Sequence, residues 1–337
     1  MITGANGGLG VATLSRFLAS PESRIYKGLF AVRNPATAKA VKKALNESAH
    51  PAQHEIIPLD MSTLAGVRAG AEQINRRVIT GELPPIRALV LNAAIQDGKG
   101  QKFTEDGFES HFGINYLANF LLVLLLLQSL DKDEGRIIIV SSWSHDPYDA
   151  RNAMFIRGEE DRTIWKDPDD LAFEKVVDQK GDEYPAGYRR YGRSKTLIIM
   201  FLFELQRRLS ASAQLSNISV LAVDPGAMPN TGLVKDASWI IMILLHYFLG
   251  AVISIITWLQ PHGSYRTPWK SAGDLLAASF DKKQHGRYPQ GLYLDGSQKA
   301  QAAREATDKQ KQRALWIASL KMAGLKDGDT VLENWQQ

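Results

Sequence analysis

Two residues with proton-transfer chemistry, Tyr191 and Lys195, lie four positions apart in the chain. On a helix this spacing places them one turn apart on the same face. Because a nearby ammonium ion favours the phenolate, we predict that Lys195 lowers the tyrosine pKa from its ordinary value of about 10. Such a tyrosine can exchange a proton with a carbonyl or alcohol oxygen, which Ser142 could hold by a hydrogen bond. The alternative is that the two side chains are an ordinary pair on the surface of a helix, with a small stabilising effect, since this spacing also arises by chance.

A glycine-rich segment at the start of the chain supplies a second, independent motif. Residues 1–10 read MITGANGGLG and lead directly into a helical pattern. Such a loop lets the backbone approach a phosphate closely while helix N–H groups point at it, although a simple glycine-rich turn is the alternative. Only two residues precede Thr3, whereas a central strand normally needs about five. We therefore expect either a truncated start or a strand that is only partly formed.

The elements that must position these residues alternate along the chain. We predict strands over 26–34, 54–60, 86–94, 136–142, 217–226 and 291–296, and helices over 35–50, 62–80 with Ser62 as N-cap, 104–130, 191–209 and 299–323. This alternation predicts an α/β fold with a parallel sheet and right-handed crossovers. We interpret 1–337 as a single domain with an insertion at 143–187 near the active site; a surface loop without a role there is the alternative.

Composition limits the classes of function. The chain has 337 residues, 45% of them hydrophobic, and a net charge of +4. Its lysines and arginines are scattered, so nucleic acid is not a predicted partner. It has no cysteine, which excludes disulfides, thiolate nucleophiles and cysteine-ligated zinc, and no metal site is predicted. The first residues lack the basic start and apolar region of a secretory signal, and the predicted location is the cytoplasm.

An apolar stretch at 238–259 contains no charged residue and has a tryptophan near each end. Its length, about 28 Å between the two tryptophans as a helix, is close to that of a bilayer core. A single crossing would separate the strands predicted at 217–226 and 291–296, which must pair on one side of a membrane. We therefore predict an apolar lid over 237–260 that dips into the cytosolic face of a membrane. A lid buried in a dimer or over the domain itself is the alternative.

The end of the strand predicted at 26–34 bears on cofactor choice. In dinucleotide-binding sheets an acidic residue near this position holds the ribose 2′-hydroxyl, whereas a basic residue accommodates a 2′-phosphate. The chain has Arg33 there and no acidic residue. This favours NADP(H) over NAD(H), with an ordinary exposed arginine as the alternative.

Several motifs occur together in the order typical of one family. They are TGANGGLG, Asp60, LNAAI at 91–95, Asn115, IIIVSS, YGRSK and VDPG. On these motifs the chain resembles the short-chain dehydrogenase/reductase family from residue 1 to about 296, and within it the branch of retinol dehydrogenases and protochlorophyllide reductases. The wording of several segments resembles that of fungal sequences. The resemblance implies a Rossmann-type, doubly wound parallel sheet of about seven strands flanked by helices, with a helical lid insertion.

The resemblance also implies a role for each matching residue. Tyr191 is the general acid/base, Lys195 holds the nicotinamide ribose, Ser142 (rather than Ser141) orients the substrate oxygen, and Asn115 anchors a relay water through its backbone. The residues implied to contact the cofactor are Gly4, Asn6, Gly8, Leu9, Gly10, Arg33, Asp60, Met61, Asn92, Ala93, Tyr191, Lys195, Pro225, Gly226, Met228 and Thr231. The chain departs from the family at Ala94, where glycine is usual, and at Asn230, where threonine is usual.

These features predict an NADP(H)-dependent carbonyl reductase or alcohol dehydrogenase for a bulky apolar substrate such as a polyketide, steroid or retinoid. The fungal look favours a biosynthetic ketoreductase. The alternative is an NADP(H)-binding sensor or scaffold that does not turn over. Family members commonly pair through the two helices that here carry Asn115 and Tyr191, so a homodimer is expected.

Overall fold

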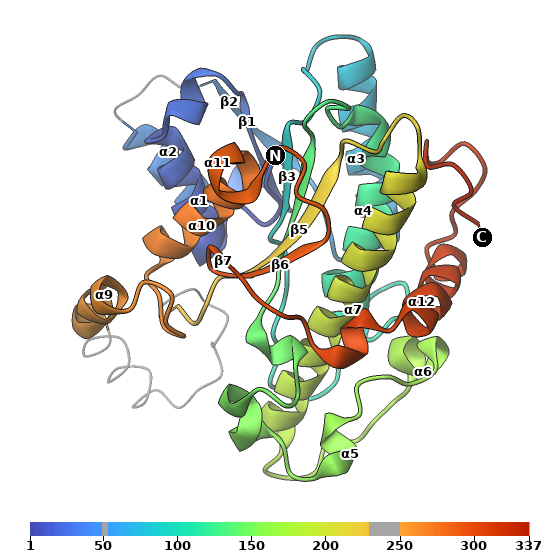
Figure 1. The fold of residues 1–337 in the computed structure, drawn as a ribbon. Helices are drawn as coiled ribbons and strands as arrows, with labels where there is room; N and C mark the ends of the chain where they lie inside the picture. The colour runs from blue at the N-terminus through green and yellow to red at the C-terminus, as the bar shows by residue number, and fades with distance from the viewer. Residues whose placement is uncertain (49–52, 229–249, 337) are drawn as a thin grey trace.

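A parallel β-sheet lies between two layers of helices in the computed structural model, which describes residues 1–48, 53–228 and 250–336 (Figure 1). The strands are β1 (Gly28–Val32), β2 (His54–Pro58), β3 (Ala88–Leu91), β4 (Arg136–Val140), β5 (Ser219–Asp224), β6 (Leu292–Asp295) and β7 (Gln298–Lys299). β1 pairs with β2, and β3 to β7 lie side by side in chain order. Only the β6–β7 pair is antiparallel. All six predicted strands are confirmed, and the short β7 was not predicted.

The first residues of the chain fill the place between β1 and β3. Ile2 forms parallel bridges to both strands. Its N–H donates to the Leu29 carbonyl at 2.9 Å and its carbonyl accepts from the Ala31 N–H at 2.9 Å, while the Thr3 N–H donates to Val90 at 3.0 Å. The central strand is therefore only partly formed, which was one of the two expectations for the start of the chain.

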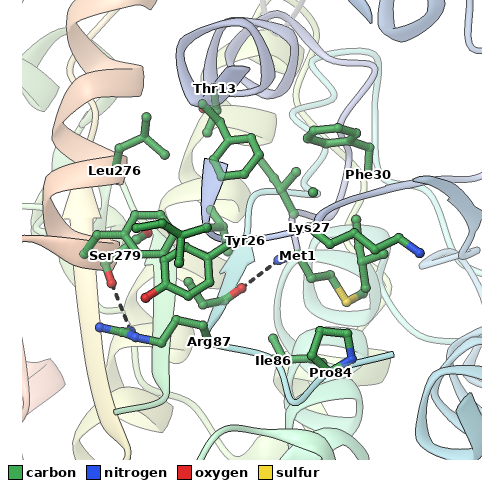
Figure 2. A pocket seen from close by; sticks show the side chains of 18 of the residues that line it. Met1, Thr13, Tyr26, Lys27, Phe30, Pro84, Ile86, Arg87, Leu276 and Ser279 are labelled. Carbon is green, nitrogen blue, oxygen red and sulfur yellow. Dashed lines mark hydrogen bonds between the residues drawn. The ribbon is translucent and has the colours of Figure 1, made fainter. Parts of the chain in front are cut away.

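A cavity of about 340 Å³ lies next to Met1 and Ile2, beside the first residues of β1 and β3 (Figure 2). The Met1 ammonium group donates to the Ala88 carbonyl at 2.7 Å, and burial lowers the pKa of this amino group to about 5. Tyr26 and Phe280 stack on each other at the wall, with 5.2 Å between ring centroids. This cavity lies at the amino ends of the strands, whereas sheets of this type bind ligands at the carboxyl ends.

The two faces of the sheet are covered by different helices (Figure 1). One layer contains α1 (Gly8–Leu18), α2 (Lys39–Asn46) and α10 (Pro268–Phe280), and the other contains α3 (Leu64–Ile79), α4 (Ala118–Leu126), α7 (Glu183–Ala211) and α12 (Lys309–Met322). Shorter helices are α5 (Glu159–Arg162), α6 (Pro168–Phe173), α9 (Gly250–Leu259) and α11 (Lys282–His285). The central strands β1, β3, β4 and β5 are mostly apolar, and every residue in them is buried, because helices cover both of their faces.

Short helical turns fill many of the connections. They are η1 (Pro21–Arg24), η2 (Pro35–Thr37), η3 (His111–Leu117, a π-helix), η4 (Leu127–Ser129), η5 (Trp143–His145), η6 (Ala150–Phe155) and η8 (Arg304–Thr307). The insertion predicted at 143–187 contains η5, η6, α5 and α6, which lie around the start of α7, and its last five residues form the first residues of α7 (Figure 1).

Several predicted helix boundaries were wrong. Thr63, not Ser62, caps α3 by accepting from the Gly66 N–H at 3.0 Å, because the Ser62 hydroxyl is bound to Asp60 at 2.6 Å. The helix predicted over 104–130 begins at 111, since Gly107 has a φ of +86° and turns the chain. The helix predicted over 35–50 is split into η2 and α2, and the one predicted over 299–323 begins at 309, after β7 and η8.

The helices expected to form a dimer interface are buried within the chain. Every residue of α4 is buried. Trp316 of α12 is 1% exposed, and its ring centroid lies 5.1 Å from that of Phe120 and 6.0 Å from that of Phe201. The homodimer therefore stays a prediction, and its interface would have to use residues outside this buried face.

One helical stretch of the described residues, His111–Ser129, is long and apolar enough to cross a membrane. Its most apolar window is 89% buried inside the protein, so the hydropathy of this stretch is that of a core helix. The candidate at 238–259 lies outside the described residues except for 250–259, which form α9.

Candidate active site

The tyrosine, the lysine and the serine predicted from the sequence meet at the carboxyl end of β4. Tyr191 and Lys195 lie on α7 and are 7% and 4% exposed. The Lys195 ammonium group donates to the Val140 carbonyl at 2.8 Å and lies 5.4 Å from the Tyr191 ring centroid. The Ser142 hydroxyl is close enough to Tyr191 to lower the pKa of its phenol through a hydrogen bond. The three groups therefore converge on one place.

Burial reverses one electrostatic expectation. Burial raises the pKa of Tyr191, and Tyr188 and Asp224 raise it further, whereas only the hydrogen bond from Ser142 lowers it. Burial also lowers the pKa of Lys195 to about 8. The prediction that Lys195 lowers the pKa of Tyr191 is therefore wrong for this structure, because burial of the phenol raises its pKa and Lys195 is not among the groups that shift it.

A buried histidine fixes the loop that carries Ser142. The His145 Nδ1 lies 2.8 Å from the Ser142 carbonyl, so Nδ1 must carry the proton that it donates. Its Nε2 accepts from the Ala303 N–H at 3.0 Å, and burial lowers the pKa of the imidazole. This neutral histidine ties the serine loop to the segment before α12. Sequence reasoning did not find it, because a single histidine after a strand carries no periodic signal.

Asn115 links β3 to α7 from the π-helical segment η3. Its side-chain amide donates to the Ile95 carbonyl at 2.9 Å and to the Ser194 hydroxyl at 3.0 Å, and its amide oxygen accepts from the Ile95 N–H at 2.8 Å. Its main-chain carbonyl accepts from Asn119 at 3.0 Å. Irregular turns of this kind are frequent at functional sites. A carbonyl oxygen has two lone pairs, so a relay water at Asn115 stays a prediction.

The glycine-rich loop packs directly against the end of β3. Gly4 has a φ of +63°, and a Cβ added there would lie 2.8 Å from the Ala93 Cα. The Asn92 amide donates to the Thr3 carbonyl at 2.9 Å and to the Gly4 carbonyl at 3.1 Å. Asn92 therefore ties the end of β3 to the start of the chain, and the loop is held in a conformation that glycine suits.

A Cβ on Gly10 would meet the Gly4 carbonyl oxygen at 2.5 Å, so the first turn of α1 also requires a small residue. Asn6 is exposed in the loop, and its side chain accepts from the Val41 N–H at 3.4 Å. Gly8 is the first residue of α1, and the Leu9 side chain is 6% exposed. The loop thus exposes its main chain and the Asn6 side chain at the carboxyl edge of the sheet. The Leu9 side chain faces the core instead.

The remaining predicted cofactor residues are distributed along the same edge. The Arg33 side chain is 68% exposed, with its Nε 3.4 Å from the Asp60 carboxylate. The Met61 side chain is 6% exposed and packs in the core, so only its backbone can face a ligand. Pro225, Gly226 and Met228 follow β5 directly. Thr231 and Asn230 lie outside the described residues.

Comparisons with known proteins point to a single protein family. The family model for short chain dehydrogenases matches residues 1–152. Short-chain dehydrogenase iccH of Talaromyces variabilis is 40% identical over 100% of this chain and 98% of its own length. Polyprenol dehydrogenase of Homo sapiens is 27% identical over 97% of this chain and 85% of its own length.

Solved structures share the fold. An uncharacterised protein from Mycobacterium paratuberculosis has a TM-score of 0.61 at 25% identity, over 96% of this chain and 92% of its own. The angucycline C-6 ketoreductase LanV, solved with bound NADP, has a TM-score of 0.54 at 17% identity, over 88% of this chain and 94% of its own. At 17% identity this second likeness supports the fold alone.

Proposed function

Because the chain belongs to the short-chain dehydrogenase/reductase family, we propose that it is an NADP(H)-dependent oxidoreductase that interconverts a carbonyl and an alcohol in a bulky apolar substrate. The family makes the chain an oxidoreductase with a nicotinamide cofactor. The observation that carries the proposal is the convergence of the Ser142 hydroxyl, the Tyr191 phenol and the Lys195 ammonium group. A sensor that only binds cofactor has no need of this arrangement.

The residues at the carboxyl edge fit a dinucleotide. Gly4 and Gly10 leave room where a Cβ would collide with backbone, and the N-terminus of α1 at Gly8 offers free N–H groups to a pyrophosphate. The cofactor, when bound, supplies or accepts the hydride. The chain itself binds, orients and transfers protons.

In the reducing direction, Ser142 donates a hydrogen bond to the substrate carbonyl oxygen and Tyr191 gives that oxygen its phenolic proton. The raised pKa of Tyr191 keeps the phenol protonated until the oxygen becomes basic. Lys195 remains one helical turn away to stabilise the phenolate that is left behind. The same groups run the oxidation in reverse.

Arg33 supports the proposed preference for NADP(H). It follows β1 immediately, its guanidinium is largely exposed, and Asp60 is its one ion-pair partner among the described residues. An exposed guanidinium at this strand end can bind a 2′-phosphate in a bidentate manner. The Asp60 oxygen in this ion pair also accepts from the Ser62 N–H at 2.9 Å, so Arg33 shares it with the main chain.

An apolar substrate is supported by α9 and by the relatives. The Ile255, Trp258 and Leu259 side chains are exposed on this helix, at 59%, 78% and 64%. The polyprenol dehydrogenases are named for a long apolar alcohol. We place α9 at the substrate entrance, where polyketides, steroids and retinoids also fit, and propose that it contacts the cytosolic face of a membrane.

Purified protein should oxidise NADPH in the presence of long-chain or polycyclic carbonyls. The test panel contains a polyprenal, retinal, a steroid ketone and α-tetralone, with acetone as the small polar control. We expect a kcat/KM at least about tenfold higher for the apolar members, because each buried methylene adds about 0.8 kcal/mol of binding. NADPH binding without any oxidation would instead support a sensor or scaffold.

Trp258→Ser should weaken binding to phosphatidylcholine vesicles about tenfold in a flotation assay, since a buried aromatic side chain contributes about 1.5–3 kcal/mol. Ile79→Ser is the matched control, because Ile79 is 74% exposed on α3 in the other helix layer. Wild-type protein that does not float, or equal loss in both variants, would remove the membrane contact from the proposal.

A further inference from the structure

A buried carboxylate at the end of β5 has no role in the mechanism above. Asp224 is 1% exposed. Its Oδ1 accepts from the Gly226 N–H at 2.9 Å, but its Oδ2 has no hydrogen-bond partner among the described residues. A buried carboxylate oxygen without a partner is costly, so its presence calls for an explanation.

The alternation of β5 decides which way Asp224 points. Val220 and Ala222 pack in the cluster that contains α7, whereas Leu221 and Val223 pack in the cluster that contains α1 and α10. Side chains alternate between the faces of a strand. Asp224 therefore lies on the α7 face, which carries the tyrosine and lysine of the active site.

The strand register places Asp224 close to the main-chain carbonyl that Lys195 contacts. Val140 is opposite Val223 in the parallel β4–β5 pair, and the Ser141 N–H donates to the Val223 carbonyl at 2.8 Å. Ser141 is thus opposite Asp224, and its buried hydroxyl also lacks a partner among the described residues. Lys195 donates to the carbonyl of Val140, the residue just before this pair.

The Gly226 N–H and two nearby arginines lower the pKa of this carboxyl group. Arg266 is 0% exposed and donates to the Asp224 carbonyl at 3.0 Å and to the Asp295 carboxylate at 2.5 Å. Arg151 lies 3.8 Å from the other Asp295 oxygen. Burial and Asp295 raise the pKa of Asp224, Arg151 and Arg266 lower it, and the result is about 6. Asp224 is therefore a carboxylate at neutral pH.

Further titratable groups from the surrounding elements act on this cluster. They are Tyr188, Tyr191 and Lys195 from α7, Tyr293 from β6, His145 from η5 and Asp149 before η6. Arg266 has a carboxylate partner in Asp295. Lys195, in contrast, contacts a main-chain carbonyl and has no carboxylate at salt-bridge distance among the described residues.

We propose that Asp224 is a positioning residue of the active site, and that its carboxylate holds Lys195 in the ammonium form. This inference rests on the proposed function for its meaning in catalysis. Burial lowers the pKa of Lys195 to about 8, and Asp224 is the charge that raises it. With that carboxylate present, a pKa of about 8 leaves roughly half of Lys195 as ammonium at pH 8. Without it a smaller fraction is charged, and a neutral amine stabilises a phenolate poorly.

The stability of the fold separates this role from a structural one. Burial raises the folded-state pKa of Asp224 from 3.8 to about 6. The group therefore stabilises the fold fully below pH 3.8, and that contribution is lost as the pH rises through 6. At pH 8 the carboxylate adds no such stability, so Asp224→Asn should fold with a Tm close to that of wild type.

The test is competitive acetylation of Lys195 with acetic anhydride across pH 6 to 11, read by peptide mass spectrometry. In the wild type the midpoint of reactivity should lie at about 8. In Asp224→Asn it should fall by about one pH unit, and Asp224→Glu should restore it. Asp224→Ser serves as a second neutral variant.

Asp274→Asn is the matched control. Asp274 is 4% exposed on α10, in the other layer, and its Oδ2 also lacks a partner among the described residues, while its Oδ1 accepts from Lys270 at 2.6 Å. It should leave the Lys195 midpoint unchanged. An unchanged midpoint in a folded neutral variant of Asp224 overturns the proposal. Because acetylation needs no substrate, this result is independent of whether the chain reduces any carbonyl in the panel.

Discussion

Tyr191→Phe is expected to lower kcat by about 10²–10⁴-fold, because general acid catalysis contributes a factor of this size. The side chain is 7% exposed, and phenylalanine keeps the ring while removing only the hydroxyl. The lost group is the proton donor to the substrate oxygen and the partner of Ser142. Stopped-flow or steady-state NADPH oxidation with the best carbonyl of the panel measures kcat, and NADPH fluorescence titration should show nearly unchanged binding.

Tyr188→Phe is the matched control for this loss. Tyr188 lies on the same helix, its ring centroid is 6.3 Å from that of Tyr191, and its hydroxyl donates to the Asn152 side chain at 2.8 Å. It should retain most of the wild-type kcat. Similar losses in both variants would mean that disturbance of the α7 packing, and not loss of a proton donor, explains the effect.

The second large effect concerns the cofactor. Arg33→Ala should reduce the ratio of kcat/KM for NADPH to that for NADH by about 10- to 150-fold, since a hydrogen-bonded ion pair contributes about 1.5–3 kcal/mol. The Arg33 side chain is 68% exposed and its ion pair with Asp60 is at the surface. Truncation should therefore cost little stability.

Arg24→Ala is the control for the removal of a positive charge. Arg24 is also exposed, but it lies in η1 before β1 and not after it. Steady-state kinetics with both cofactors should show an unchanged ratio in this variant. A wild-type enzyme that prefers NADH, or equal ratios in wild type and Arg33→Ala, would be incompatible with a 2′-phosphate site at Arg33.

The fold was readable from the sequence because parallel strands buried on both faces are continuous apolar runs. The runs at 136–142 and 217–226 became β4 and β5 with small changes at their ends. The place of Ser142 also followed, since the carboxyl ends of parallel strands share one edge of the sheet, whereas the position of Tyr191 beside it was implied by the family motifs. Motif order supplied the family, which the comparison with iccH then confirmed.

Other features depend on packing that a sequence does not display. The direction of the Tyr191 pKa shift was mistaken because burial of the phenol follows from the tertiary structure. Asp224 ends β5 and His145 follows β4, and only the strand register and the tertiary contacts show which groups these two side chains face. The helix predicted over 104–130 began late because Gly107 turns the chain within an otherwise helical pattern.

The central claim is that Ser142, Tyr191 and Lys195 hold a carbonyl beside a nicotinamide ring for hydride transfer. Its most direct test uses NADPH carrying deuterium at both positions of C4 of that ring, with the panel carbonyl that is consumed fastest. We predict an alcohol product with one deuterium on the former carbonyl carbon, and about 10²–10⁴-fold slower formation of this product by Tyr191→Phe. An alcohol without deuterium, or no consumption of NADPH with any panel member, would contradict the account.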